Sequence, residues 1–124
     1  MNERIAMLFP GQGIQHSGIC KELYQNSKNA RYIFHLANEI LNENIVEKYI
    51  FGDENIPANI VQPFIVTASL AYYKTFIDNY GIKPSYVAGH SLGEYSALIA
   101  AGCIEFHDAL ELVKKRAAHY ERKL

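Results

Sequence analysis

The segment SYVAGHSLGEYSALIAAG, residues 85–102, decides the fold class of this chain. Its first five residues predict a buried β-strand, and the residues that follow the serine predict a helix that runs to Ala101 and stops at Gly102. Between strand and helix, residues 89–93 (GHSLG) match the pattern G-x-S-x-G, which at a strand-to-helix turn is the signature of a nucleophile elbow. Ser91 is therefore the candidate nucleophile.

The two glycines of this pattern have a physical role in the expected turn. The turn is so tight that side chains at Gly89 and Gly93 would collide with neighbouring backbone, and it holds the serine in a strained conformation. The helix that follows directs its N-terminus at the site, which stabilises negative charge there. The alternative is a glycine-rich turn with an incidental serine, because the bare pattern is common.

The order of the remaining elements predicts an α/β protein with a parallel sheet. Residues 5–9 (IAMLF) form an apolar run that Pro10 stops, which is typical of a strand buried on both faces. Pro63 is expected in the first turn of a long helix, where proline is tolerated, and Gly81 ends that helix. The other expected elements are helices over residues 17–42, 62–80 and 106–124 and a surface connection over residues 51–60.

Composition limits the chain to one globular domain at most. Its 124 residues are 49% hydrophobic, and 12 Lys and Arg against 13 Asp and Glu give a formal charge of −1, so neither overall disorder nor nucleic-acid binding is expected. No apolar stretch approaches the roughly 18–20 residues of a membrane span, and no signal peptide is visible, so we expect a cytoplasmic protein. Cys20 and Cys103 have no metal-ligand spacing, so no metal site is indicated.

A serine hydroxyl needs a base to become a good nucleophile, and no histidine of the sequence has a context that identifies it as that base. His90 adjoins Ser91, but neighbouring side chains diverge at an elbow, so His90 is a poor candidate. The other histidines are His16, His35, His107 and His119.

Two segments resemble malonyl-CoA:acyl carrier protein transacylases and the acyltransferase domains of polyketide synthases. Residues 8–15 (LFPGQGIQ) resemble the family's FPGQGSQ segment, with Ile14 in place of the usual serine, and residues 89–98 (GHSLGEYSAL) resemble its GHSxGE segment. The resemblance implies that residues 1–124 are the N-terminal part of an acyltransferase domain with a partial α/β-hydrolase-like core. The catalytic histidine, later strands and an inserted ferredoxin-like subdomain would then be absent from this chain, which we expect to be truncated or split.

The resemblance also implies roles for individual residues. Ser91 would accept the acyl group, and the backbone N–H groups of Gln12 and Leu92 would form the oxyanion hole. Arg116, 25 residues after the serine, would clamp the free carboxylate of malonate, and Gln62 would lie near that pocket. A guanidinium can hold a carboxylate through two hydrogen bonds, whereas the competing interpretation of Arg116 is a structural side chain along its helix.

The expected reaction is transfer of a malonyl group from coenzyme A to an acyl carrier protein thiol through a serine ester, in fatty acid or polyketide biosynthesis. Malonyl-CoA and the carrier protein are the expected partners, with no cofactor, nucleic acid or membrane. One alternative is a thioesterase that uses water as acceptor. Another is a non-catalytic fragment that pairs with a complementary C-terminal fragment. Without a base, we expect the chain alone to be inactive and marginally folded, with an open sheet that exposes apolar surface.

Overall fold

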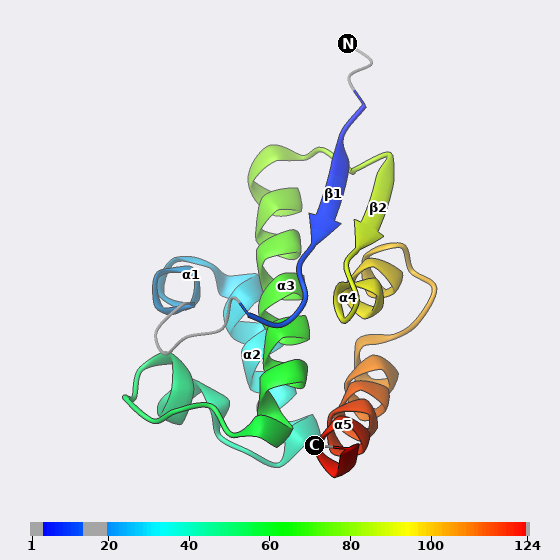
Figure 1. Ribbon diagram of the computed structural model, residues 1–124. Helices are drawn as coiled ribbons and strands as arrows, with labels where there is room; N and C mark the ends of the chain where they lie inside the picture. Colours follow the sequence, from blue (N-terminus) through cyan, green and yellow to red (C-terminus); the bar gives the residue numbers. More distant parts are fainter. Residues whose placement is uncertain (1–3, 14–19, 124) are drawn as a thin grey trace.

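The computed structural model describes residues 4–13 and 20–123, and it is a mixed α/β structure with a small parallel sheet (Figure 1). Strands β1 (Ala6–Phe9) and β2 (Tyr86–Gly89) pair in register, Ala6 with Tyr86 and Phe9 with Gly89, so the expected parallel pairing is confirmed. The helices are α1 (Lys21–Asn26), α2 (Lys28–Leu41), the π-helix η1 (Val46–Ile50), α3 (Ala58–Tyr80), α4 (Gly93–Ala100) and α5 (Phe106–Lys123).

The sheet is buried on one face only, so the expectation that both faces are buried is wrong. Phe9 is 5% exposed and packs against the ring of Tyr73 in α3, with ring centroids 6.0 Å apart. On the opposite face Leu8 is 74% exposed and Tyr86 58% exposed. Both strands are apolar, which suits a sheet covered on both faces. In the described part of the chain, α4 packs against both strands and Tyr73 of α3 packs against Phe9. The expected exposure of apolar surface is confirmed.

The single helix expected over residues 17–42 is two helices. Ser27 interrupts it with extended backbone, and its hydroxyl accepts a hydrogen bond from the Ala30 N–H at 3.1 Å, so it caps α2. The same hydroxyl lies 2.8 Å from the hydroxyl of Thr75 in α3, which anchors the break to the core. The start of the expected helix, together with Ile14 and His16, lies outside the described residues.

Helix α3 begins at Ala58, four residues before the expected start, so Pro63 lies inside the helix and the expected first-turn position is wrong. Pro57 occupies the N-cap and is the proline that marks the true start. An interior proline removes one helical hydrogen bond, at a cost of roughly 3 kcal/mol. Packing offsets this loss, because residues 60–71 are buried around the whole helix.

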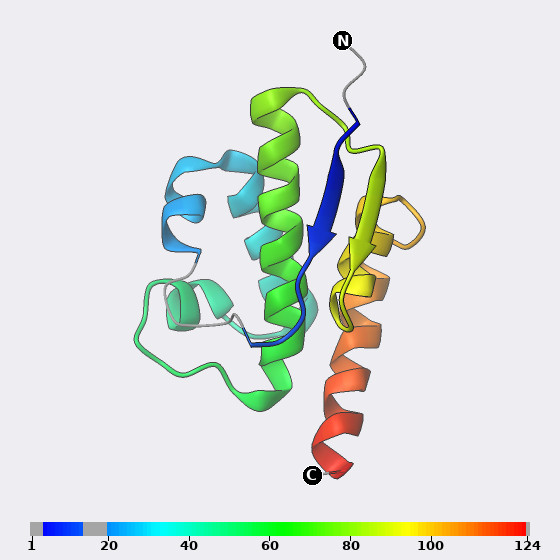
Figure 2. The ribbon, with the colours of Figure 1, turned by 45° about the horizontal axis from the view of Figure 1, so that its top comes forward.

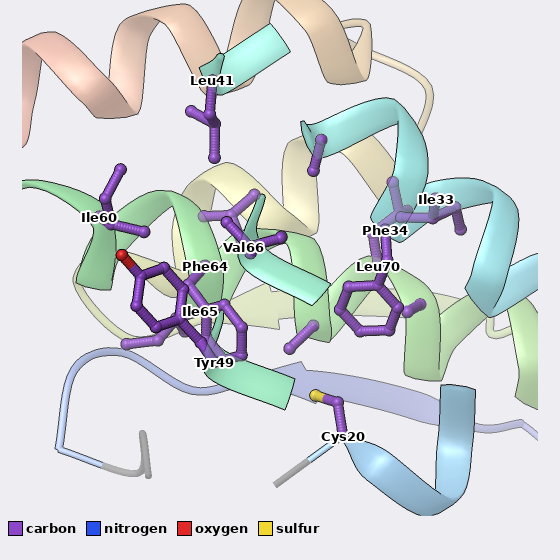
Figure 3. Close-up of a cluster of buried hydrophobic side chains, with 14 of the residues drawn as sticks. Cys20, Ile33, Phe34, Leu41, Tyr49, Ile60, Phe64, Ile65, Val66 and Leu70 are labelled. Carbon is purple, nitrogen blue, oxygen red and sulfur yellow. The ribbon is translucent and has the colours of Figure 1, made fainter. Parts of the chain in front are cut away.

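The core surrounds the N-terminal half of α3 (Figure 3). Helices α2 and α5 pack against α3, and η1, which the sequence analysis does not anticipate, closes one end of the cluster. Among the helices of the described residues, none is sufficiently long and apolar to span a membrane. The central side chains are Phe34 from α2, Tyr49 from η1, Phe64, Ile65, Val66 and Leu70 from α3, and Leu110 and Val113 from α5.

Candidate active site

Ser91 lies at a strained turn between β2 and α4. Its φ is +55°, in the left-handed region that side chains other than glycine adopt rarely. A Cβ on Gly89 would collide with the backbone carbonyl of Gly93, and a Cβ on Gly93 would collide with the carbonyl of Phe9. Both collisions involve backbone atoms, so the predicted need for two glycines is confirmed, and the turn has the geometry of a nucleophile elbow.

The loop after β1 packs directly against this elbow. The N–H of His90 donates to the carbonyl of Phe9 at 3.1 Å, and a Cβ on Gly11 would lie 2.9 Å from the His90 carbonyl and 3.7 Å from the Leu92 nitrogen. Gln12 follows in an exposed turn. The two sequence motifs, about 80 residues apart in the chain, therefore meet at one end of the sheet.

Leu92 is buried, with 1% of its surface exposed, directly after the serine. The N–H groups of Gly93, Glu94 and Tyr95 donate to the carbonyls of the three residues before Gly93, at 2.9–3.1 Å. No backbone carbonyl of the described residues accepts from the Leu92 N–H. The Leu92 N–H, next in sequence to Ser91, is thus not used by the main-chain hydrogen bonds of this turn.

Arg116 joins the elbow to the core. Its Nη2 donates to the Ser91 Oγ at 3.2 Å, and its Nη1 donates to the Gln62 Oε1 at 2.5 Å. Gln62 is 3% exposed and comes from α3, whereas Arg116 is half-buried and comes from α5. The structure therefore brings together three of the residues singled out from the sequence.

The charge at the elbow favours an anion. The Arg116 guanidinium lies at the serine, and the positive end of α4 begins two residues after it. From the sequence, Gln62 was assigned to the site through the family resemblance alone. Its position also carries a signal of its own, because it is a polar residue inside a buried apolar run, residues 60–66. A buried amide of this kind requires a partner, and its partner is Arg116.

The described histidines do not supply a base to the serine. His35 pairs with the Tyr24 hydroxyl at 2.7 Å, and His107 lies 3.8 Å from its neighbour Asp108. His90 and His119 are exposed, and within residues 4–13 and 20–123 no histidine hydrogen-bonds to Ser91. The same ranges contain no group of three side chains able to hold a metal ion.

A serine at a strand–turn–helix elbow in a mixed α/β structure is the arrangement found in α/β proteins that carry the G-x-S-x-G pattern. The sequence matches the acyl transferase domain family over residues 6–122. This chain therefore belongs to the acyl transferase domain family.

Individual members of the family are similar to this chain over most of its length. The malonyl CoA-acyl carrier protein transacylase of Bacillus subtilis (strain 168) is 44% identical over 115 residues, which cover 91% of this chain and 36% of the relative. The crystal structure of the acyl-carrier-protein S-malonyltransferase of Burkholderia pseudomallei 1710b matches with a TM-score of 0.85 and 40% identity. The match covers 94% of this chain and 38% of the Burkholderia chain.

A second similar structure contains a partner. It is a malonyl-transacylase in complex with the acyl carrier protein of a type II polyketide synthase, and it matches with a TM-score of 0.90 and 34% identity. It covers 98% of this chain and 40% of that one. The chain thus spans between a third and two fifths of the length of these relatives.

Proposed function

We propose that this chain is the nucleophile-bearing part of an acyltransferase that moves a malonyl group from coenzyme A to an acyl carrier protein, in fatty acid or polyketide biosynthesis. The observation that carries the proposal is the hydrogen-bonded set of Ser91, Arg116 and Gln62. A guanidinium at the nucleophile suits an acyl group that ends in a carboxylate, because an arginine can bind it through two charged hydrogen bonds. The names of the relatives support the same substrate and partner.

The proposed reaction has two steps with Ser91 as the covalent carrier. In the first, Ser91 Oγ attacks the thioester carbonyl, the bond to sulfur breaks, and coenzyme A leaves with the proton of the serine. In the second, the carrier protein thiol attacks the serine ester, the ester C–O bond breaks, and the proton of the thiol passes to Ser91 Oγ. The N–H groups of Gln12 and Leu92 would stabilise the oxyanion in both steps.

The base that moves these protons would come from outside the described residues. We also infer that the small sheet is part of an α/β-hydrolase-like core, because the elbow follows a strand in a parallel pair. A thioesterase would need the same elbow, but a cation at the serine is of no use to a neutral acyl chain.

The test uses a chimera in which residues 1–124 replace the corresponding part of the Bacillus subtilis relative. After incubation with malonyl-CoA, intact mass should show one malonyl adduct. The adduct should be lost in Ser91→Ala and retained in Ser85→Ala, which alters an exposed serine before the same strand. An adduct that persists in Ser91→Ala would refute the assignment.

A further inference from the structure

We propose that Gly11 is a positioning residue that sets the width of the oxyanion hole. Because Gly11 has no side chain, the loop after β1 lies directly against the elbow, and this contact fixes the separation of the Gln12 and Leu92 N–H groups. The proposal rests on the proposed function for the assignment of these two groups to the oxyanion. The contact itself follows from the backbone geometry of the loop and the elbow.

Gly11 approaches the elbow more closely than a larger residue could. It is buried, and a Cβ at this position would lie 2.9 Å from the carbonyl oxygen of His90, closer than Cβ atoms approach other atoms in proteins. The same Cβ would lie 3.7 Å from the Leu92 nitrogen, an ordinary van der Waals distance. The obstructing atom is a backbone oxygen and cannot rotate aside, so a methyl group on residue 11 would push the loop and the elbow apart.

The two glycines that flank Gln12 serve different purposes. Gly13 has a φ of +111°, which favours glycine, and among the described residues no atom beyond its chain neighbours lies within 4 Å of an added Cβ. The φ of Gly11 is not positive in this way, so its φ does not exclude alanine. Glycine is therefore required at position 11 by lack of space and at position 13 by backbone conformation.

Further backbone contacts hold the same two segments together, so the loop cannot slide to make room for a methyl group. The His90 N–H donates to the Phe9 carbonyl at 3.1 Å, and a Cβ on Gly93 would lie 3.0 Å from the carbonyl oxygen of Pro10. Figures 1 and 2 show β1 and β2 ending side by side, with α4 beginning directly after β2. The loop and the elbow are thus in backbone contact on both sides of Gly11.

A shift of Gly11 reaches the oxyanion hole through one planar peptide group. That group joins Gly11 to Gln12 and carries the Gln12 N–H, so this donor moves with Gly11. Oxyanion donors act within about 2.7–3.1 Å of the oxygen that becomes negative, and a misplacement of about 1 Å costs roughly a hundredfold in rate. Because this charge develops only toward the transition state, the loss falls on kcat and leaves KM nearly unchanged.

Single-turnover kinetics of the chimera test the effect on the reaction. At saturating malonyl-CoA, the rate of adduct formation in Gly11→Ala should fall roughly ten- to a hundredfold, with the half-saturating concentration unchanged within about twofold. The matched control is Gly102→Ala, whose added carbon meets nothing within 4 Å, and its rate should stay within about twofold of the parent. An unchanged rate in Gly11→Ala, or equal losses in the two variants, would overturn the proposal.

Amide hydrogen exchange at His90 tests the contact without relying on activity. A methyl group on residue 11 that separates the loop from the elbow should also weaken the neighbouring hydrogen bond from the His90 N–H to the Phe9 carbonyl. In the chimera, the His90 amide should therefore exchange at least about tenfold faster in Gly11→Ala than in the parent or in Gly102→Ala. Equal exchange at His90 in all three proteins would overturn the proposal.

The two measurements separate this inference from the proposed function. A parent chimera that forms no malonyl adduct would refute the proposed function, and faster His90 exchange in Gly11→Ala would still support the contact. A chimera that forms the adduct, loses it in Ser91→Ala and keeps its full rate in Gly11→Ala would support the proposed function and overturn this inference.

Discussion

Arg116, in helix α5, donates a hydrogen bond to the oxygen of the Ser91 hydroxyl at 3.2 Å, across 25 residues of sequence. The contact occupies a lone pair of the atom that would attack a thioester. A malonyl carboxylate would compete for the same guanidinium and would release the serine oxygen as it binds. Under the proposed function, the arrangement would couple recognition of the carboxylate to exposure of the nucleophile.

Replacing Arg116 by alanine should change the selectivity for malonyl over acetyl groups more than it changes the transfer of acetyl groups. A charged hydrogen bond to a carboxylate contributes about 1.5–3 kcal/mol, so kcat/KM for malonyl transfer should fall roughly ten- to a hundredfold relative to acetyl transfer. Both substrates would be assayed in the chimera, with Lys115→Ala, at an exposed neighbouring position, as control. Equal losses for the two acyl groups would mean that Arg116 has a structural role.

Gln62 should act on malonyl binding through Arg116. In Gln62→Glu the buried amide oxygen, 2.5 Å from Nη1, becomes a carboxylate that pairs with the guanidinium and competes with malonate. We expect KM for malonyl-CoA to rise roughly tenfold, with acetyl transfer little changed, since a charged hydrogen bond is worth about 1.5–3 kcal/mol. The neutral variant Gln62→Met provides the comparison, because it fills the site without a charge. A larger KM effect from Gln62→Met than from Gln62→Glu would contradict the competition.

The elbow was predictable from sequence because one short pattern, GHSLG, contains both glycines and the serine. Gly89 and Gly93 are each required by collisions with backbone within a few residues or with the adjoining strand, and the pattern GHSLG encodes that requirement. The meeting of Arg116, Gln62 and Ser91 was not derivable from spacing alone. It depends on how α3 and α5 pack, and only the family resemblance placed those residues near one pocket.

The errors in the expected fold arise where tertiary packing overrides local signals. Pro63 is a strong marker of a helix start, but Pro57 marks the true start, and burial around α3 offsets the missing hydrogen bond of the interior proline. Ser27 divides an apparently continuous helical pattern because its hydroxyl has a partner in Thr75, 48 residues later. The exposed face of β1 departs from the expected burial on both faces. Its apolar pattern shows that the strand suits burial, but not whether the described residues cover both of its faces.

Gly89→Ala should destabilise the fold much more than a substitution at an open glycine. The added methyl group would meet the backbone of Gly93, which cannot rotate aside, so we expect a loss of about 3 kcal/mol or more. Gly102→Ala is the matched control, because its φ is +78° but nothing lies within 4 Å of the added atom. It should cost about 1–2 kcal/mol. Urea unfolding of both variants measures the difference, and equal midpoints would contradict the collision.

The two cysteines should differ in reactivity because one is buried. Cys20 is fully buried, and burial raises the pKa of its thiol from the ordinary value of 9.0 to about 12, whereas Cys103 is exposed. A buried neutral thiol is a poor nucleophile. At pH 8, iodoacetamide should therefore label the native chain at Cys103 and leave Cys20 unmodified until urea is added. Rapid labelling of Cys20 in the native chain would disprove this burial.

The raised pKa of Cys20 also predicts the direction of alkaline destabilisation. The folded chain keeps a proton that the unfolded chain loses above about pH 9, so this contribution to stability is complete below pH 9 and declines as pH rises toward 12. The slope should approach about 1.4 kcal/mol per pH unit. Burial also raises the pKa values of Tyr49 and Tyr72 above their ordinary 10.0, so both tyrosines add to the decline as pH approaches 10, and the part due to the cysteine is the difference between the native sequence and Cys20→Ala. Free energies of unfolding in urea should fall from pH 9 to pH 10 with equal slope in the native sequence and in Cys103→Ala, and should fall less steeply in Cys20→Ala. A decline of equal slope in Cys20→Ala would assign the effect to another group.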